Sequence, residues 1–506
     1  MTPTPEERPG RVDALRRRIG LVAAPLAFAA LLAAPLGLEP AAHRLAAVVA
    51  LTVVLWVSEA IPLAATALLA PALAVLLGVA PAAQAFAPIA SPLIFLFLGG
   101  FMIARALAAH RLDRRAALWL LSRPAIAGSP TRVVVAIACA SFVGSMWISN
   151  TATTAMLLPV ALGLCAALGA FTPPERRGEL RRYASGMVLA IAYGSSLGGM
   201  TTPIGTAPNV ITLDLLERQA GIHLDFFEWM SFALPVGVLC LVALLLWLSV
   251  RFPAPPTRVS GLADTVAAER RALGPLGPGE RRVLAVFAAA IAGWLLPTVL
   301  KVALGATHPI TAWSTQGLDE GVVAVLAASL LFIAPRGDAS GEPLLPWSQA
   351  TDIDWGTLYL LGGGLALGKM MFDTGLAAAL AAGALDLAGP LAASPFGLLA
   401  VSTLLMTMIT EITSNTAATS MMIPVLLAIG ARLGIDPLPM ALSVTLAASN
   451  AFMLPVSTPP NAIVYGSGHV RLGEMIRTGA LLDIVGYAIL LACGALLLPH
   501  VRLGGG

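Results

Sequence analysis

The sequence predicts an all-α membrane protein that crosses the bilayer several times. Its 506 residues are 58% hydrophobic and 11% charged, with a mean hydropathy of +0.86, whereas soluble domains are about 25% charged. Apolar runs of roughly 20 residues, long enough to cross a bilayer as helices, recur along the chain and lack the strict alternation of a membrane β-barrel. The predicted spans lie near residues 20–38, 44–62, 91–109, 229–250, 281–300, 320–334, 355–372 and 478–499.

A basic segment at residues 1–19 precedes the first predicted span. Its arginines are Arg8, Arg11, Arg16, Arg17 and Arg18. By the positive-inside rule, we expect this N-terminal segment to be cytoplasmic and the protein to lie in the inner (plasma) membrane. A signal peptide also begins with basic residues, but no small-residue cleavage site followed by a polar mature domain is apparent.

Two polar motifs occur twice in the same order. SMWISNTATTAMLLPV and TEITSNTAATSMMIPV share 8 of 16 residues, and the later segments GMTTPIGTAPNVI and AFMLPVSTPPNAI share 5 of 13. A third pair, FLGGFMIARAL and LLGGGLALGKM, lies upstream. The matched ranges are 97–107 with 360–370, 145–160 with 410–425, and 199–211 with 451–463. Three landmarks in one order indicate an internal repeat.

The repeat divides the chain into two predicted halves, 20–252 and 281–506, joined by a Pro- and Gly-rich extramembrane linker at 253–280. In the first half we expect a hairpin, a broken helix and a following span at about 133–172, 184–216 and 229–250. In the second half we expect a hairpin, a broken helix and a last span at about 397–430, 439–466 and 478–499.

Arginine placement predicts how the two hairpins are oriented. Arginines flank the first hairpin on both sides, at Arg105, Arg111, Arg114, Arg115, Arg123 and Arg132, and at Arg176, Arg177, Arg181 and Arg182. Both flanks should therefore be cytoplasmic, and the polar tip favours a re-entrant hairpin over two full spans. Around the second hairpin, 386–396 has no basic residue and 431–438 has only Arg432. That hairpin should open to the outside, giving an inverted repeat.

Each SNT precedes a helix-compatible run, so its polar residues are candidates for helix N-caps with free backbone N–H groups after them. Helix N-termini bind anions well, and these side chains can hydrogen-bond carboxylate or sulfate oxygens. The candidate residues are Ser149, Asn150, Thr151, Ser414, Asn415 and Thr416.

The segments PIGTAPN and PVSTPPN predict breaks in apolar helices, because proline removes a donor and clashes with the preceding turn. The freed carbonyls and the hydroxyls are ligands that suit a hard cation such as sodium. A buried anion and a buried cation close together lower each other's electrostatic cost. The repeat thus predicts a site for both.

The motif residues also admit structural and enzymatic interpretations. Serine and threonine in membrane helices often bond only to their own turn or link helices, but two matched copies with broken partners argue against that. GSSLG at 194–198 lacks the strand–turn–helix context of a hydrolase, and GGLALGKM at 363–370 has Met370 where a phosphate loop needs Ser or Thr. The cysteines and histidines are scattered, so we expect neither a metal cluster nor an enzyme.

Two ionisable residues lie within or near predicted spans. For Lys369 the first interpretation is a side chain that reaches to the membrane interface. For Glu411, which adjoins the second SNT, a structural hydrogen-bonding role ranks just ahead of an ion-coupling role.

The paired SNT motifs, each followed by a (G/S)TxPN segment, resemble the divalent anion/sodium symporter family of di- and tricarboxylate and sulfate carriers. The resemblance covers nearly the whole chain. It implies about 11 transmembrane helices plus two opposed re-entrant hairpins, a scaffold part and a transport part in each protomer of a homodimer, and an elevator motion of the transport part.

The resemblance also implies site residues. The first sodium site would use Ser145, Ser149, Asn150 and the Gly205 carbonyl; the second would use Thr410, Thr413, Asn415 and the Ser457 carbonyl. The substrate would meet the six SNT residues, with Thr206, Thr458 and Pro459 lining the site. Ser457 stands where small apolar residues are usual in the family, which matters little if only its carbonyl binds.

The predicted function is sodium-coupled symport of a small divalent anion, a C4-dicarboxylate such as succinate, malate or fumarate. Na⁺ is the expected coupling ion, with no other cofactor and no nucleic-acid partner. Some relatives exchange anions without sodium and replace the cation with a basic side chain; neither motif pair contains one here. The alternatives are a sodium-independent dicarboxylate or citrate exchanger, a sulfate carrier, an ion channel and a membrane enzyme.

Overall fold

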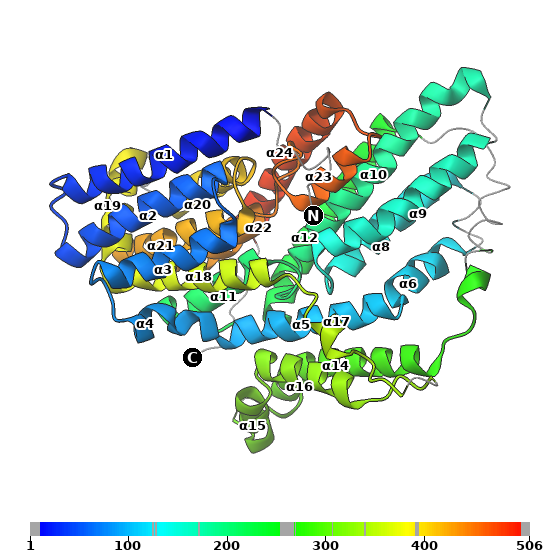
Figure 1. Cartoon of the computed structure of the whole chain (residues 1–506), viewed down its shortest axis with the longest axis horizontal. Coiled ribbons are helices and arrows are strands. Elements are labelled where there is room, and N and C mark those ends of the chain that lie inside the picture. Colours follow the sequence, from blue (N-terminus) through cyan, green and yellow to red (C-terminus); the bar gives the residue numbers. More distant parts are fainter. Residues whose placement is uncertain are drawn as a thin grey trace. The chain divides into compact units, whose positions relative to one another are not determined.

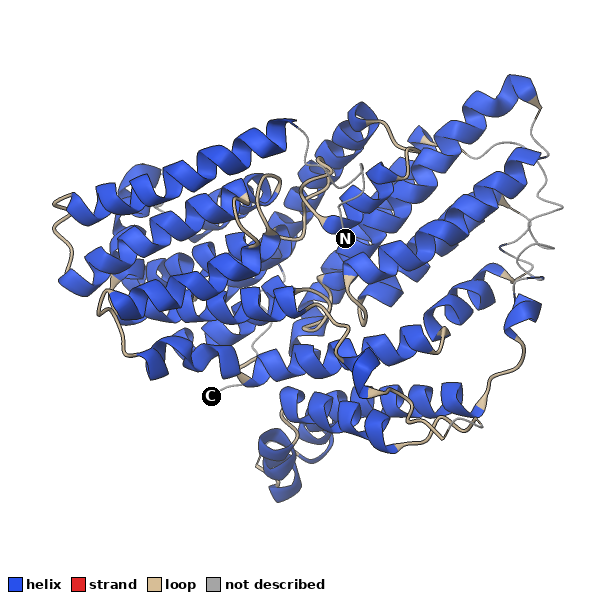
Figure 2. Cartoon of the chain, viewed as in Figure 1, coloured by secondary structure: helices blue, strands red, loops and turns tan. Residues whose placement is uncertain are grey.

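A computed structural model describes residues 11–123, 126, 129–170, 173–253, 268, 270–305, 307–338, 341–389 and 394–496. Over this part of the chain the regular structure is helical (Figure 2), and one isolated bridge joins Pro335 and Pro343. The first ten residues of the predicted N-terminal segment and most of the predicted linker, 254–267 and 269, lie outside the described residues. So do residues 171–172 of the first predicted hairpin and 497–499 of the last predicted span.

The chain forms two compact units. Unit 1 comprises Met1–Ile94, Ile211–His223 and Trp355–Thr445, and unit 2 comprises Phe95–Val210, Leu224–Asp354 and Leu446–Gly506. Each unit takes segments from both predicted halves, so this division differs from the division by repeats. The two repeat halves stay a prediction.

Unit 1 is built around tightly packed helices. In Figure 1, α1 and α2 run side by side, and a β-carbon at Gly20 would lie 2.0 Å from the Ser58 hydroxyl oxygen. Likewise, a β-carbon at Gly363 of α18 would lie 2.2 Å from the Ala67 carbonyl oxygen of α3. Small residues thus let the helix backbones approach closely. Its helices include α1 (Arg11–Ala33), α2 (Pro40–Ser58), α3 (Leu63–Leu76), α4 (Ala82–Phe86), α18 (Trp355–Asp373), α19 (Leu376–Ala388), α20 (Pro395–Thr410) and α21 (Asn415–Leu433).

Unit 2 holds the remaining long helices. The Tyr183 hydroxyl of α10 donates to the Pro130 carbonyl of α8 at 2.7 Å, and the rings of Trp147, Phe226 and Trp294 stack on one another. Its helices include α6 (Leu112–Leu121), α8 (Pro130–Ser145), α9 (Asn150–Ala170), α10 (Arg177–Gly199), α12 (Phe226–Arg251), α14 (Pro278–Leu304), α15 (Pro309–Gly317), α16 (Glu320–Ile333), α17 (Trp347–Ala350), α23 (Pro459–Gly466) and α24 (Leu472–Leu496). Three helices, α5 (Pro92–Ala109), α11 (Ala207–Leu215) and α22 (Leu438–Ala447), contribute residues to both units.

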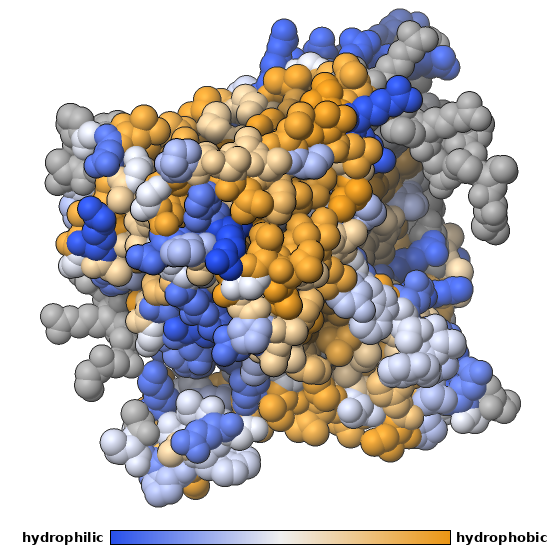
Figure 3. Space-filling model, turned by 60° about the vertical axis from the view of Figure 1, so that its left-hand side comes forward, coloured by the Kyte–Doolittle hydropathy of each residue, from blue (hydrophilic) through white to orange (hydrophobic). Residues whose placement is uncertain are grey.

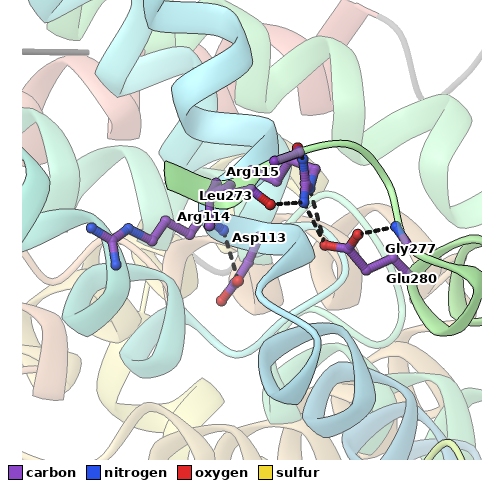
Figure 4. Close-up of polar contacts among 7 residues, drawn as sticks. Asp113, Arg114, Arg115, Leu273, Gly277 and Glu280 are labelled. Carbon is purple, nitrogen blue, oxygen red and sulfur yellow. Dashed lines mark hydrogen bonds and ion pairs between the residues drawn. The ribbon is translucent and has the colours of Figure 1, made fainter. Parts of the chain in front are cut away.

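An ion pair fixes α6 to the start of α14 within unit 2. The Arg115 guanidinium lies 2.8 Å from Glu280 and also donates to the carbonyls of Leu273 and Gly274 (Figure 4). The other carboxylate oxygen of Glu280 accepts from the Gly277 N–H. Both ionic side chains are less than one-fifth exposed, which suits a pair that holds an extended segment in place.

Several helices are long and apolar enough to cross a membrane. Among the described residues six qualify singly, and two bent pairs, α15 with α16 and α18 with α19, raise the number to eight. The six are Pro40–Ser58, Pro92–Ala109, Phe226–Arg251, Pro278–Leu304, Asn415–Leu433 and Leu472–Ala495. In Figure 3, apolar side chains cover much of the face in view, as a lipid-facing surface requires.

The first predicted span is shifted along the chain. We expected 20–38, but α1 runs over Arg11–Ala33. The arginines at its start extend the helix because their long side chains can reach polar surroundings while the backbone stays helical. At its other end, Pro35 and Gly37 follow, and Gly37 has a φ of +65°.

A pair of packed helices occupies the range of each expected hairpin, whereas re-entry into the membrane stays a prediction. α8 and α9 pack against each other and are joined at residues 146–149, and α20 and α21 pack against each other and are joined at 411–414. Helices also end and begin within the two ranges where breaks are expected. α10 ends at Gly199 before α11 begins at Ala207, and α22 ends at Ala447 before α23 begins at Pro459. By length and composition α21 could itself cross a membrane.

Candidate functional site

The first hairpin tip is organised around Asn150, the first residue of α9. Its side-chain oxygen accepts a hydrogen bond from the Ser145 hydroxyl at 2.6 Å, and Ser145 is fully buried. Ser149 stands just before the helix, where its hydroxyl oxygen accepts from the Ala152 N–H at 3.3 Å. Ser149 thus caps α9 as predicted, whereas the side chain of Asn150 reaches back to α8 instead of capping.

The first helix break is held by Asn209, which is fully buried in α11. Its amide nitrogen donates to the carbonyls of Gly199 at 3.2 Å, Met200 at 3.3 Å and Thr202 at 2.7 Å. Helix termini leave carbonyls without partners inside the helix. The two N–H groups of this one side chain are thus shared among three carbonyls at the break, with the shortest bond to Thr202.

The first hairpin tip and the first break meet inside unit 2. A β-carbon at Gly199 would lie 2.1 Å from the side-chain oxygen of Asn150, and one at Gly205 would lie 2.2 Å from the Gly199 carbonyl oxygen. The Thr202 hydroxyl donates to the Met146 carbonyl at 2.6 Å. Glycine is therefore required at both positions, since a side chain at 199 would clash with Asn150 of the tip and one at 205 would clash with the backbone at the end of α10.

The second hairpin tip, in unit 1, repeats the first. The Thr410 hydroxyl donates to the side-chain oxygen of Asn415 at 2.6 Å. Ser414 occupies the N-cap position of α21 without a side-chain capping bond. Thr413 is 4% exposed, and its hydroxyl has no hydrogen-bond partner among the described residues. An unsatisfied buried hydroxyl at this tip is costly unless something binds it.

The second break, in unit 2, also repeats the first. Asn461 is fully buried, and its amide nitrogen donates to the carbonyls of Ala451 at 2.9 Å and Leu454 at 3.0 Å. The Thr458 hydroxyl oxygen accepts from the Asn461 N–H at 3.3 Å, which caps α23. Ser457 and Thr458 are buried. This break belongs to unit 2, whereas the second tip belongs to unit 1.

Exposure differs among the predicted site residues. Ser149, Asn150, Thr206, Ser414 and Asn415 are half-buried. Buried are Ser145, Gly205, Thr410, Thr413, Thr416, Ser457 and Thr458, whereas Thr151 and Pro459 are exposed.

Sequence reasoning missed the roles of Asn209 and Asn461. Both are identical positions of the repeated segments 199–211 and 451–463, but this identity alone predicts no role for them. Their identity in two segments that otherwise differ at most positions is the sequence feature that could have indicated a structural role. They are structural supports of the site, since their amides donate to backbone carbonyls within or just before each break.

A cavity of about 310 Å³ in unit 2 adjoins the first tip. Ser149 and Thr153 line it together with the Arg105–Asp352 ion pair, whose charged atoms are 2.7 Å apart. Asp113 also lines it, and burial raises the pKa of that carboxyl, partly opposed by the Arg114 backbone N–H. The first tip therefore borders a polar cavity.

The remaining candidates lie in helices or ion pairs. Lys369 pairs with Asp373 one turn along α18, and its side chain is 39% exposed. Glu411 is 3% exposed at the end of α20. GSSLG lies inside α10 and GGLALGKM inside α18, so neither has the loop that a nucleophile elbow or phosphate loop needs.

Comparison with known proteins identifies the family. Residues 13–501 match the model of the sodium:sulfate symporter transmembrane region. The chain belongs to the divalent anion/sodium symporter family. This is a family of membrane transporters, so the expectation of a multi-pass transporter is confirmed.

Individual members of the family resemble the whole chain. A protein of Staphylococcus saprophyticus named sodium-dependent dicarboxylate transporter SdcS is 30% identical over 491 residues, covering 96% of this chain and 92% of the relative. A protein of Haemophilus influenzae named uncharacterized transporter is 34% identical over 465 residues, covering 90% and 92%. The SdcS protein of Staphylococcus aureus is 30% identical over 452 residues, covering 88% and 84%.

A solved structure supports the fold. The YdaH transporter of Alcanivorax borkumensis aligns with a TM-score of 0.55 and 18% identity, covering 97% of this chain and 99% of that chain. At this identity the likeness concerns the fold alone. The predicted all-α transporter architecture is confirmed at that level.

Proposed function

We propose that this protein imports a C4-dicarboxylate, such as succinate, malate or fumarate, together with sodium ions. The relatives of about 30% identity that carry the name sodium-dependent dicarboxylate transporter support both the ion and the substrate class. The absence of any basic residue from both motif pairs also supports sodium, because a fixed cation there would compete with it.

The observation that carries the proposal is the same hydrogen bond at both hairpin tips. A hydroxyl five residues earlier donates to the side-chain oxygen of Asn150 and of Asn415, each at 2.6 Å. A side-chain amide oxygen has two lone pairs, and its nitrogen has two donors. With one lone pair occupied, the oxygen can still bind a cation while the nitrogen donates to an anion. One amide thus serves both ions.

The two sodium sites in this proposal follow the two repeats. The first takes oxygens from Ser145, Ser149, Asn150 and the Gly205 carbonyl, and the second from Thr410, Thr413, Asn415 and the Ser457 carbonyl. The buried Thr413 hydroxyl without a hydrogen-bond partner among the described residues supports a cation ligand at the second.

The substrate carboxylates in the proposal meet the donors of the two tips. These are Ser149, Asn150, Thr151, Ser414, Asn415 and Thr416, with Thr206, Thr458 and Pro459 around them. The N-termini of α9 and α21 add their backbone N–H groups and partial positive charge. Bound sodium lowers the cost of burying the dianion beside it.

The transport cycle in this proposal begins with sodium, which orders the hairpin tips before the anion binds. The loaded transport part then moves against a scaffold in an elevator motion within a homodimer. We propose that the protein has about 11 spans, two re-entrant hairpins in an inverted repeat, and a cytoplasmic N-terminus in the inner membrane. The helix pairs that form both tips support the hairpins.

Uptake of labelled succinate into proteoliposomes tests the proposal. We expect an inward sodium gradient to drive accumulation, and choline in its place to reduce initial uptake at least about tenfold. Equal uptake in both salts contradicts sodium coupling and favours a dicarboxylate or citrate exchanger. Competition by excess citrate or sulfate, in place of malate or fumarate, contradicts the C4-dicarboxylate assignment. Conductance without saturation favours a channel.

A further inference from the structure

Helix α24 packs directly on the second helix break. A β-carbon at Gly479 would lie 2.3 Å from the Phe452 carbonyl oxygen and 2.5 Å from the Met453 nitrogen. One at Gly486 would lie 2.6 Å from the amide nitrogen of Asn450. The two glycines are seven residues apart and share one face of the helix. That face therefore covers the non-helical segment 450–453.

Asp483 lies on the same face, between the two glycines. It follows Gly479 by four residues and precedes Gly486 by three, which places it on the helix face that covers the broken segment. It is 3% exposed and lies inside the candidate span Leu472–Ala495. Ionisable residues buried within membrane spans usually mark ion or substrate pathways.

Asn450 is the polar group that α24 covers at this point. It is 1% exposed, and neither its amide oxygen nor its amide nitrogen has a hydrogen-bond partner among the described residues. Buried side-chain amides nearly always have partners, and an unsatisfied one costs about 1–3 kcal/mol. The orphaned oxygen of Asn450 is thus a second, independent indication of a ligand beside Asp483.

The first half of the chain lacks both polar groups. There, Gly237 of α12 covers the first break, since its β-carbon would lie 2.5 Å from the side chain of Thr201. Thr201 corresponds to Met453 in the repeat. When Gly237 is matched with Gly479, Leu241 occupies the place of Asp483.

In this match of α12 with α24, Leu244 occupies the place of Gly486. In the repeat of the two breaks, which has its own register, Gly198 corresponds to Asn450. Both leucines are buried. The duplicated architecture therefore folds with an apolar helix face over its break. The polar pair in the second half is an addition to that architecture, so packing alone does not account for it.

We infer that the Asp483 carboxylate and the Asn450 side-chain oxygen bind a sodium ion between α24 and the second break, at a site that uses no residue of either hairpin tip. Carboxylate and amide oxygens are the ligands that hard cations prefer. The carboxylate supplies the balancing charge, which the neutral tips lack. Binding here stands independently, whereas its coupling to transport rests on the proposed function.

Sodium-dependent thermal stabilisation of the purified protein in detergent tests this site. The starting variant carries Asn150→Ala and Asn415→Ala, which remove the asparagine ligand of each tip site and should abolish sodium binding there. We expect sodium, compared with choline, still to raise the Tm of this variant. Adding Asp483→Asn should remove that remaining rise. A sodium-induced rise that persists after Asp483→Asn overturns the inference, as does no rise in the starting variant.

A milder variant covers the case in which Asp483→Asn does not fold. Asn450→Gly restores the residue of the first half and should raise the sodium concentration for half-maximal stabilisation about tenfold. The matched control is Leu241→Ala, at the equivalent buried position of α12, which should leave that concentration unchanged. An unchanged concentration in Asn450→Gly contradicts the inference.

The Tm measurement also distinguishes sodium binding at Asp483 from protonation of Asp483. It further distinguishes a failure of this inference from a failure of the proposed function. If Asp483→Asn removes a pH-dependent change in Tm but leaves the sodium-dependent change intact, Asp483 carries a proton and the sodium site is wrong. Absence of sodium-driven uptake by the unaltered protein would refute the proposed function. The sodium-dependent change in Tm of the variant with Asn150→Ala and Asn415→Ala would still test the site at Asp483.

Discussion

At the scale of single residues, two asparagines occupy equivalent positions in segments that share only half of their residues. Asn150 and Asn415 each begin a helix and each accept a hydroxyl hydrogen bond from the helix before. The donor is serine in one copy and threonine in the other. What the repeat preserves is therefore the orientation of the amide.

We predict that Asn150→Ala and Asn415→Ala each abolish transport. Alanine removes the oxygen proposed for sodium and the nitrogen proposed for the carboxylate. Loss of a hydrogen bond to a charged group costs about 1.5–3 kcal/mol, or roughly 10–150-fold in affinity. Sodium-driven uptake by proteoliposomes should fall below about one-tenth, while size-exclusion chromatography in detergent shows an intact assembly.

A matched control lies one turn into the second tip helix. The Thr419 hydroxyl donates to the Asn415 carbonyl at 2.8 Å, within its own helix. Such back-bonding contributes little to stability. Thr419→Val should therefore keep at least about half of the uptake. Near-normal uptake in both alanine variants would show that the site assignment is wrong.

At the scale of helices, glycine sets how closely α10 approaches α8. A β-carbon at Gly198 would lie 2.0 Å from the Phe142 carbonyl oxygen, and one at Gly194 would lie 3.0 Å from the Ala138 carbonyl oxygen. These contacts are with backbone atoms, which cannot move aside as a flexible side chain can. Close packing at Gly198 holds the helix that ends at the first break.

We predict that Gly198→Ala destabilises the protein by about 2 kcal/mol or more, since overpacking against backbone forces the helices apart. The matched control is Gly163→Ala inside α9, where a β-carbon would meet no atom within 4 Å. That change should alter stability by less than about 1 kcal/mol, in the stabilising direction. Thermal unfolding in detergent compares the two; equal Tm values contradict the packing argument.

Much of the helix order could be predicted from sequence. The prolines and polar residues of the motifs marked the breaks before Ala207 and Pro459, because proline disrupts a helix whatever surrounds it. The first span was misplaced at its start. A hydropathy window excludes arginine because it is polar, but arginine is a good helix former. The helix α1 therefore begins at Arg11, before the apolar run that starts at residue 20.

Other features of the site depend on the path of the backbone. Asn209 and Asn461 bind carbonyls seven and ten residues earlier, and these separations become short only once the break has a defined shape. The contact between Gly199 and Asn150 likewise joins segments 49 residues apart. Sequence patterns identify such residues as repeated, but do not give their partners.

At the scale of the whole molecule, the repeat and the compact units divide the chain differently. The first tip and both breaks belong to unit 2, and the second tip belongs to unit 1. An inverted repeat nevertheless fixes the membrane topology of equivalent loops, whatever the packing of the helices. Equivalent loops in the two halves must lie on opposite sides of the membrane.

We therefore predict opposite accessibility for the loops that follow the two hairpins. Glu175→Cys lies after α9, and Arg432→Cys lies in the last turn of α21; both native side chains are exposed. In intact cells, with the four native cysteines replaced, an impermeant maleimide should label only the cysteine at 432. Opening the membrane should then allow labelling at 175. The inverted arrangement is wrong if both cysteines react equally in intact cells, because arginine-rich flanks on the first hairpin alone would then not have set its orientation.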